Sequence, residues 1–332
     1  MSVLSTNNPT LSDVAKRLDP NGQVATIAEV LSETNEVMDE MPWMEGNLPT
    51  GHRHTIRSGL PQPTWRKLYG GVQPSRSTTV QVTDTAGMLE AYSEVDKALA
   101  DMNSNVASFR MTEDTAHLEA MSQELAQTLF YGDESTYPER FTGFAPRFND
   151  LSAENADNII DAGGTGSDNL SVWLVGWSNL TCMGIFPKGS TAGLEFRDLG
   201  ERTIEDVDGN GGRMQAYRSH YKWHAGLAVR DWRYVVRIAN IDKSDLTKDA
   251  SSGADLLDLM TQALHLPPSL SNARFAFYAN RTVTSFLARQ HVNKVAQSTL
   301  SMEQIGQRLT TTFGGIPVRR VDALKDNEAR VT

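Results

Sequence analysis

The chain has 332 residues, a mass of 36.6 kDa and a formal net charge of −10. Strong binding to phosphate backbones depends on clustered Lys and Arg, so this charge argues against a protein whose main task is to hold nucleic acid. The single cysteine, Cys182, excludes an internal disulfide, and we find neither a signal sequence nor an apolar run long enough to cross a membrane. We therefore expect a soluble protein that is made inside the cell and has no membrane partner.

The N-terminal segment is expected to form an arm with two short amphipathic helices, at 10–18 and 24–31. A different pattern follows at 41–81, where prolines and glycines alternate around extended runs at 53–58 and 78–83. This pattern predicts a long two-stranded excursion from the body of the protein.

From Thr85 the spacing of apolar residues becomes helical and continues to Leu99, and a longer helix is expected to begin near Thr112. Apolar residues three and four apart line one face of that longer helix: Leu118, Met121, Leu125 and Leu129. Gly132 follows them, where a glycine with positive φ commonly ends a helix. We take this as the longest helix of the chain.

After an irregular stretch at 133–166, the sequence predicts several strands. The run 171–177 is apolar on both faces, as in a central strand. Two half-buried antiparallel strands are expected at 217–223 and 232–238, where polar and apolar residues alternate. The elements expected after these are a helix at 257–264 that ends before Pro267, a strand at 275–278, a helix around 283–287 and a closing strand at 315–321.

His220 and His224 are four residues apart, a spacing that lets two histidines share a zinc ion when they lie on a helix. The alternation around them indicates a strand instead, which would place the two side chains about 13 Å apart. The glutamate of a zinc-protease motif is also absent. A structural role is therefore the favoured interpretation, and a metal-dependent hydrolase that uses His220 and His224 is kept as an alternative.

The segment 206–211 resembles the first half of a calcium-binding loop, but Tyr217 stands where a bidentate glutamate is needed. A hairpin turn is the better account of its Asp, Gly and Asn residues. The sequence contains no phosphate-binding glycine loop and no nucleophilic-serine motif. We therefore predict no catalytic residue, no cofactor, no metal site and no enzymatic activity.

Cations and large aromatic residues occur together in only one region, within the predicted excursion. One interpretation is a nucleic-acid-binding module centred on Arg53–Lys67. The other is an interface with a second copy of the chain, because Trp, Tyr and Arg carry much of the binding energy between proteins. The excursion has too little apolar content to fold on itself, which favours the interface. The candidate inter-subunit contact residues are Trp43, His54, Arg57, Trp65, Arg66, Lys67 and Tyr69.

Several runs of the sequence resemble the major capsid protein of short-tailed double-stranded-DNA phages. They cover most of the chain and are densest in its first half. The runs are Met41–Gly46, Gly51–Pro61, Gly87–Tyr92, Glu94–Lys97, Leu129–Gly132, Phe141–Arg147, Arg230–Tyr234 and Gly315–Arg319.

The resemblance implies the α+β capsid fold of tailed phages. This fold has an N-terminal arm, an extended β-hairpin loop, a peripheral domain in which a long spine helix lies beside a β-sheet, and an axial domain of mixed α/β structure. The implied divisions are the arm at 1–46, the extended loop at 47–84, the spine helix and peripheral domain at 85–150, a sheet-rich region shared between the peripheral and axial domains at 151–241, and the axial domain with the closing strand at 242–332.

The implied function is that of a structural protein that self-assembles into the icosahedral shell around a phage double-stranded DNA genome. Its implied partners are further copies of itself in hexamers and pentamers, portal and scaffolding proteins and, where one exists, a decoration protein. Packaged DNA would be a loosely held neighbour, since a net acidic shell lets DNA slide. The implied location is the virion capsid, after synthesis and assembly in the host cytoplasm.

Overall fold

The structure is a computed structural model that describes residues 33, 35–102, 106–205, 212–248, 250, 253–293, 300–305 and 308–332. Its helices and mixed β-sheet confirm the expected α+β class. The helices expected at 10–18 and 24–31 and the turn expected at 206–211 lie outside the described residues. No helix within the described ranges is long and apolar enough to cross a membrane.

The chain separates into two compact units. Unit 1 comprises Met1–Thr34, Met88–Ala126 and Gly193–His224, and unit 2 comprises Asn35–Gly87, Gln127–Ala192 and Ala225–Thr332. Three long elements contribute residues to both units: β3 (Thr78–Asp96), α4 (Val106–Tyr131) and β8 (Arg213–Val229).

Unit 2 contains most of the remaining elements. They are α2 (Val37–Glu40), β1 (Trp43–Glu45), β2 (Gly51–Gly59), η1 (Ala145–Arg147), η2 (Ala156–Asn158), β4 (Ile159–Asp161), β5 (Asn169–Trp177), β6 (Cys182–Phe186), η3 (Trp232–Tyr234), β9 (Val235–Asp242), α5 (Leu256–His265), β10 (Arg274–Ala279), α6 (Arg281–Asn293), β11 (Leu300–Ile305), β12 (Arg308–Phe313) and β13 (Ile316–Arg320).

Strand β5 is the centre of the sheet of unit 2. It pairs antiparallel with β10 and with β9, and all of its residues are buried. Val172 and Leu174 join the cluster formed by α5 and α6. Trp173 points to the opposite face, since neighbours on a strand alternate, and packs against rings such as Phe144 and Phe148. The apolar run at 171–177 therefore forms a strand buried on both faces, as predicted.

The later predictions for unit 2 are also confirmed. Helix α5 ends before Pro267, β10 and α6 follow it, and β13 forms near the C-terminus. β13 pairs parallel with β10 and antiparallel with β12, which in turn pairs with β11. Phe313 of β12 is buried against Phe277 of β10, with ring centroids 5.8 Å apart. These strands extend the central sheet beyond β10.

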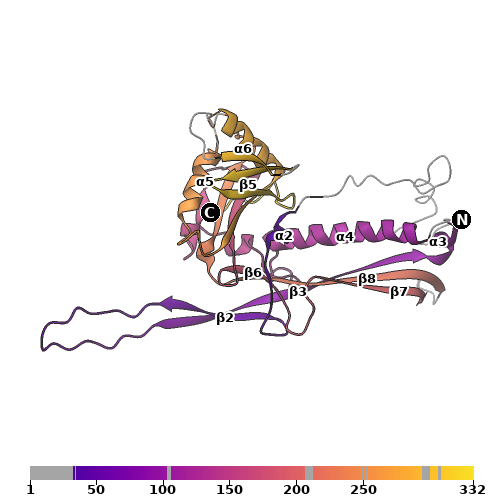
Figure 1. Cartoon of the computed structure of the whole chain (residues 1–332), viewed down its shortest axis with the longest axis horizontal. Coiled ribbons are helices and arrows are strands. Elements are labelled where there is room, and N and C mark those ends of the chain that lie inside the picture. Colours follow the sequence, from indigo (N-terminus) through magenta and orange to yellow (C-terminus); the bar gives the residue numbers. More distant parts are fainter. Residues whose placement is uncertain are drawn as a thin grey trace. The chain divides into compact units, whose positions relative to one another are not determined.

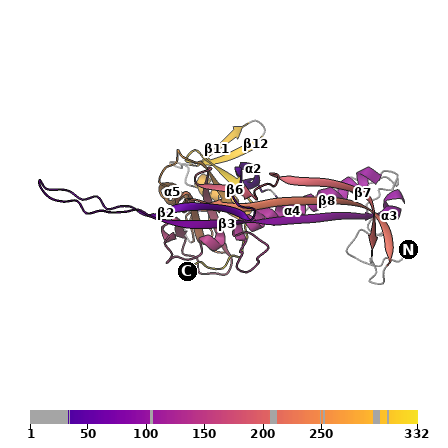
Figure 2. The same ribbon diagram turned by 90° about the horizontal axis from the view of Figure 1, so that it is seen from below.

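Unit 1 is an antiparallel ribbon of strands beside a long helix (Figure 2). β7 (Leu194–Glu205) pairs with β8 along its whole length, and β3 lies next to β8 in the strand order. α3 (Lys97–Met102) and the first part of α4 cover this ribbon through a small cluster of Val95, Ala100 and Phe109. An ion pair of 2.7 Å between Arg110 of α4 and Asp198 of β7 adds a polar contact.

The prediction of a helix from Thr85 is wrong. This segment continues β3 as far as Asp96, and the helix that follows is only the short α3. The segment also shows a period of two, because every second residue is more buried than its neighbours: Leu89, Ala91, Ser93 and Val95. Strand pairing decides between the two periods, because β3 is hydrogen-bonded to the neighbouring β8.

The long helix is present and ends at Tyr131, directly before Gly132 as predicted, but its start and the conformation of Gly132 differ from the prediction. α4 begins at Val106 rather than near Thr112, and Met121, Leu125 and Leu129 are buried as expected. Gly132 does not have positive φ. Glycine is required there because a Cβ would lie 2.4 Å from the Phe141 carbonyl oxygen. Close packing, and not a left-handed cap, therefore selects this glycine.

The two strands expected around 217–223 and 232–238 do not form a half-buried pair. β9 begins only after η3, is buried at every position and pairs with β4 and β5. β8 pairs instead with β6 and β7. The alternation of Arg233 and Arg237 with apolar residues suggested a solvent-facing side for β9, but Arg237 is buried in an ion pair.

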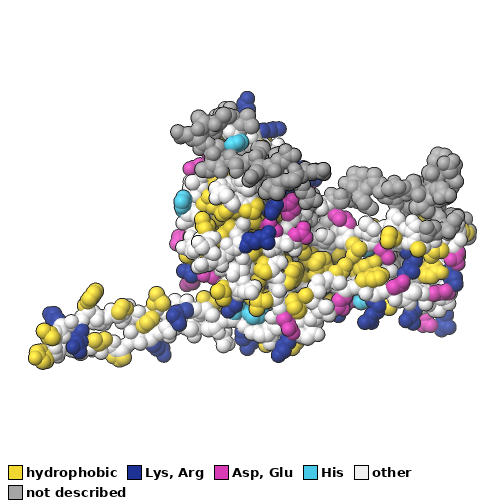
Figure 3. All heavy atoms as spheres, in the orientation of Figure 1, with side chains coloured by type: hydrophobic (Ala, Val, Ile, Leu, Met, Phe, Trp, Pro, Cys, Tyr) yellow, Lys and Arg dark blue, Asp and Glu magenta, His cyan; other side chains and the backbone are white. Residues whose placement is uncertain are grey.

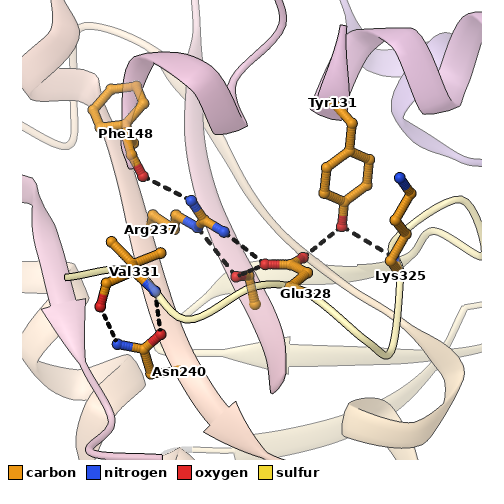
Figure 4. A network of polar contacts seen from close by, with 8 residues as sticks. Tyr131, Phe148, Arg237, Asn240, Lys325, Glu328 and Val331 are labelled. Carbon is orange, nitrogen blue, oxygen red and sulfur yellow. Dashed lines mark hydrogen bonds and ion pairs between the residues drawn. The ribbon is translucent and has the colours of Figure 1, made fainter. Parts of the chain in front are cut away.

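That ion pair holds the C-terminal tail against unit 2 (Figure 4). Arg237 donates to Glu328 at 2.6 Å, and the same carboxylate accepts from Ser171 and Tyr131, each at 2.5 Å. Burial, followed by the adjacent carboxylate, raises the pKa of Tyr131, so the phenol keeps its proton and donates. Asn240 bonds to both the N–H and the carbonyl of a tail residue, Val331. The tail is therefore part of the folded core of unit 2.

We expect Glu328→Ala to lower the free energy of unfolding by about 3–5 kcal/mol, because it leaves the buried Arg237 without its charge partner. Chemical denaturation of the purified chain measures this change. Asp326→Ala is the matched control, since its ion pair with Lys243 is exposed and should contribute about 1 kcal/mol or less. Equal losses in the two variants would contradict a special role for the buried pair.

Candidate functional site: the extended hairpin

The two-stranded excursion predicted from the sequence is present as a long hairpin of unit 2. β2 pairs antiparallel with β3 from Gly51 opposite Thr85 to Gly59 opposite Thr78, with a register shift near the outer end. Beyond this point the two legs continue without strand pairing, as Figures 1 and 2 show. A turn closes the hairpin, in which the Gly70 N–H donates to the Lys67 carbonyl at 3.0 Å.

The tip of this hairpin, defined as residues 60–77, has no core of its own. Trp65 and Tyr69 are as exposed as they would be in an extended peptide, at 101% and 103%. Further exposed apolar residues are Leu60, Leu68 and Val72. Exposed apolar residues gathered in this way indicate an interaction surface rather than ordinary scatter.

The tip is also positively charged. The segment 47–84 contains five Lys and Arg residues but a single acid, Asp84, in a chain whose net charge is −10. In Figure 3 the hairpin outward from its root shows hydrophobic and basic side chains and no acidic ones. A surface of this kind is complementary to an acidic surface that also offers apolar contacts.

Tyr69 adds backbone strain to the turn. Its φ is 63°, in the left-handed region that bulky side chains rarely occupy. This conformation costs roughly 1–2 kcal/mol relative to a right-handed one. Strain of this size gathers at binding sites, where it presents a side chain in a required direction. Here the side chain presented is an aromatic ring with full exposure.

The root of the hairpin is fixed by close backbone packing. A Cβ on Gly51 would lie 2.0 Å from the Asp84 carbonyl oxygen, so only glycine lets β2 begin this close to β3. The Asn47 side chain then bonds to both the N–H and the carbonyl of Arg53, at 2.7 and 2.6 Å. These contacts set the register in which the two strands leave unit 2.

Two buried histidines and an ion pair lie at this root. Asp84 accepts an ion-pair contact of 2.8 Å from Arg147, whose guanidinium also donates to the carbonyl of Leu227 at 3.3 Å. His54 Nδ1 is 3.5 Å from the second oxygen of Asp84, and the rings of His52 and His54 are stacked with centroids 6.1 Å apart. The histidines thus face a single carboxylate that is already paired with arginine.

Burial lowers the pKa of both histidines. For His52, the positive charge of Arg230 lowers it further, and Asp84 opposes the shift. For His54, Asp84 likewise opposes the effect of burial, while His52, Arg230 and Arg147 add to it. Both rings are therefore neutral at pH 7 in the folded chain.

The candidate contact residues lie at four places in the structure. Trp65, Arg66, Lys67 and Tyr69 lie at the exposed tip, and Arg57 is exposed on β2. His54 is buried at the root. Trp43 lies in β1 and packs on Gly184 of its own chain, where an added Cβ would come within 2.9 Å of the indole. The structure thus brings four of the seven residues together in the tip.

Sequence reasoning missed several functional features of the hairpin. Leu60, Leu68 and Val72 add apolar surface to the tip, and their position between the two extended runs could have identified them. Arg147 carries no such local signal, because its partner Asp84 is far away in the sequence.

The alternative metal site receives no support. His220 and His224 lie on β8, as the alternation predicted, and His220 stacks on Tyr92 with ring centroids 4.4 Å apart. Nε2 of His220 lies 3.3 Å from a Glu90 carboxylate oxygen. Among the residues that the structure describes, no group of three His, Cys, Asp or Glu side chains could hold a metal ion.

We expect the free energy of unfolding of the chain to fall as the pH drops below about 6.5, the usual histidine pKa. Both folded-state pKa values lie below it, so the unfolded chain binds protons first and is favoured. The contribution of the two neutral histidines to the free energy of unfolding is complete above pH 6.5. It is lost as the pH falls through their folded-state pKa values. Thermal unfolding from neutral pH to about pH 5 measures it.

The double variant His52→Asn/His54→Asn should flatten this part of the pH dependence. His265→Asn, which removes an exposed histidine at the end of α5, is the control and should keep it. An unchanged pH profile in the double variant would mean that other groups cause the dependence.

A family model and a solved structure match the chain along most or all of its length. The family model described as Major capsid protein GP7 matches residues 19–332. A solved structure of bacteriophage epsilon15 contains a chain 38% identical to this one, with a TM-score of 0.78, and the alignment covers 100% of this chain and 99% of the other. A chain of the bacteriophage JBD30 capsid is 8% identical with a TM-score of 0.49, and its alignment covers 90% of this chain and 95% of the other.

No curated protein matches the chain significantly in sequence. The family model nevertheless spans almost the whole chain, and the epsilon15 chain is similar along its entire length. The exposed hairpin, the long helix beside a ribbon of strands and the central mixed sheet are therefore features of a phage shell protein, and the chain belongs to the major capsid protein GP7 family.

Proposed function

We propose that copies of this chain form hexamers and pentamers that close into an icosahedral shell around double-stranded DNA, and that the hairpin tip binds a neighbouring copy. The observation that supports the contact is the exposure of Trp65 and Tyr69 on a segment with no core of its own. Burying two such aromatic side chains against a partner would provide several kcal/mol of association energy. The capsid role itself follows from the family.

The proposed domain organisation places the arm at 1–46 and the extended loop at 47–84. The helix α4 together with the ribbon of β3, β7 and β8 would form the spine and sheet of the peripheral domain, and the sheet centred on β5 with α5 and α6 would form the axial domain. The division of contacts into two units supports this assignment. The region 151–241 contributes strands to both units, in line with its proposed sharing between the domains.

Portal, scaffolding and decoration proteins are proposed as further partners, with synthesis and assembly in the host cytoplasm. Packaged DNA is proposed as a loosely held neighbour, because a chain with a net charge of −10 repels phosphate overall. Nucleic-acid binding by the Arg53–Lys67 segment is the competing use of the same tip. Affinity for an oligonucleotide that falls steeply with added salt and is lost with Trp65→Ala would favour that use.

We expect Trp65→Ala and Arg66→Ala to leave the free energy of unfolding within about 0.5 kcal/mol, since both side chains are exposed. Assembly should weaken by about 2 kcal/mol or more per contact if these residues are anchors. Circular dichroism measures the fold, and light scattering with electron microscopy measures the yield of shells. Gln81→Ala, on the paired part of β3, is the control. Loss of the folded core in the tip variants would place the tip inside the subunit.

A further inference from the structure

A pocket of about 590 Å³ lies beside the root of the hairpin, entirely within unit 2. Its first wall is β2 and the residues that follow it, from His54 to Leu60. The opposite wall is formed by Leu180 and by residues 230–233, after the end of β8. The volume lies in the range of pockets that take small ligands or a few residues of a peptide.

The charged groups of the pocket are mainly cationic. Arg233 is neutralised by Asp231, which accepts from two of its nitrogens at 2.9 and 2.8 Å. Arg230 donates to the Asn179 carbonyl at 2.9 Å, and Arg57 is exposed on the other wall. Within the described part of the chain, neither Arg57 nor Arg230 forms an ion pair with a carboxylate. The pocket therefore has two arginines without a counter-charge.

His54 supplies an independent sign of a binding site. Its side chain is only 2% exposed, yet it lines the pocket. Neither ring nitrogen has a hydrogen-bond partner among the described residues. Its approach of 3.5 Å to Asp84 is longer than a hydrogen bond. Buried polar groups are nearly always paired, so an unpaired one that faces a pocket indicates a partner from outside the unit.

We propose that this pocket binds a carboxylate-bearing segment of a second copy of the chain. Arg57 and Arg230, on opposite walls, would donate to the carboxylate, and a ring N–H of His54 would add a hydrogen bond from within. Arginine pairs with carboxylates through two parallel hydrogen bonds, which makes such a contact specific as well as strong. This inference rests on the proposed function, because it requires copies to pack together.

Charge and position both favour a second copy as the occupant. The segment 47–84 is strongly basic while the whole chain is acidic, so the remainder of every copy carries the carboxylates. The pocket is also continuous with the hairpin whose tip we propose as the contact surface. One neighbouring copy could thus engage the tip through its apolar surface and the root through its acids.

Zero-length crosslinking tests the contact in assembled shells. In Arg57→Lys, the new amine is expected to lie against the carboxylate of the neighbouring copy. A carbodiimide then joins the amine and the carboxylate as an amide, and the reagent is converted to a urea by the water that is released. Shells built from a mixture of isotopically light and heavy chains separate crosslinks between copies from those within one copy. We expect the amine introduced by Arg57→Lys to be joined to an Asp or Glu of the other isotope, at least about tenfold more often than in the control.

Arg53→Lys is the matched control, since Arg53 is exposed on the same strand but does not line the pocket. If Arg57→Lys folds but does not assemble, Arg230→Lys places the amine on the opposite wall. Arg57→Ala should keep the fold and lower the yield of shells.

The outcomes separate this inference from the proposed function. The inference is wrong if shells form but neither Arg57→Lys nor Arg230→Lys gives a crosslink between copies. The shell role would then remain intact. A crosslink within one copy would also overturn it. So would a pocket that binds nucleic acid instead, which would appear as a loss of affinity for a short oligonucleotide in Arg57→Ala and no protein crosslink. Failure of the unmodified chain to form shells, even with scaffolding protein, would instead overturn the proposed function.

Discussion

The ion pair between Arg147 and Asp84 is the buried side-chain contact that holds the root of the hairpin in place. Pairing of β2 with β3 joins the two legs to each other, and the sheet continues from β3 to β8. Arg147 adds a side-chain connection to the rest of unit 2, because one guanidinium bonds to Asp84 and to carbonyls of Thr142, Gly143 and Leu227. A buried carboxylate held in this way fixes position strongly, since removing either partner leaves an uncompensated charge.

Unit 2 uses its aromatic residues in two opposite ways. Around Trp173 they are packed ring against ring in a dry core, where burial stabilises the single chain. At the hairpin tip, Trp65 and Tyr69 contribute nothing to that core. The hydrophobic effect favours burying both kinds equally, so the tip retains a driving force that only contact with another molecule can satisfy. Membership of a shell-forming family makes a further copy the natural source of that contact.

The sequence predicts the parts of the fold that have one dominant local pattern. The apolar run at 171–177 and the two runs that flank the prolines and glycines of the hairpin are such cases, and the unusual composition of the tip identified its aromatic and basic residues. The prediction for the segment from Thr85 to Asp96 failed because its apolar residues fit both the period of two of a strand and the period of about four of a helix. The choice depends on a partner strand that is distant in sequence. The pocket and the histidine cluster could not be predicted either, because Arg147 meets Asp84 of β3, and Arg230 lies opposite β2, only through tertiary structure.

Several features that are unfavourable in a single chain lie on the hairpin or beside its root. They are the left-handed Tyr69, the unpaired nitrogens of His54, the arginines without counter-charges and the exposed rings of the tip. Elsewhere in unit 2 the buried charges of Arg237 and Glu328 are paired with each other and with neighbouring polar groups. A surface that is at once apolar and acidic would bury the exposed rings and pair the arginines, and in the shell that we propose a neighbouring subunit would supply it. The residues that leave the free hairpin with unsatisfied apolar and charged groups would then be the ones that stabilise the proposed contact between copies.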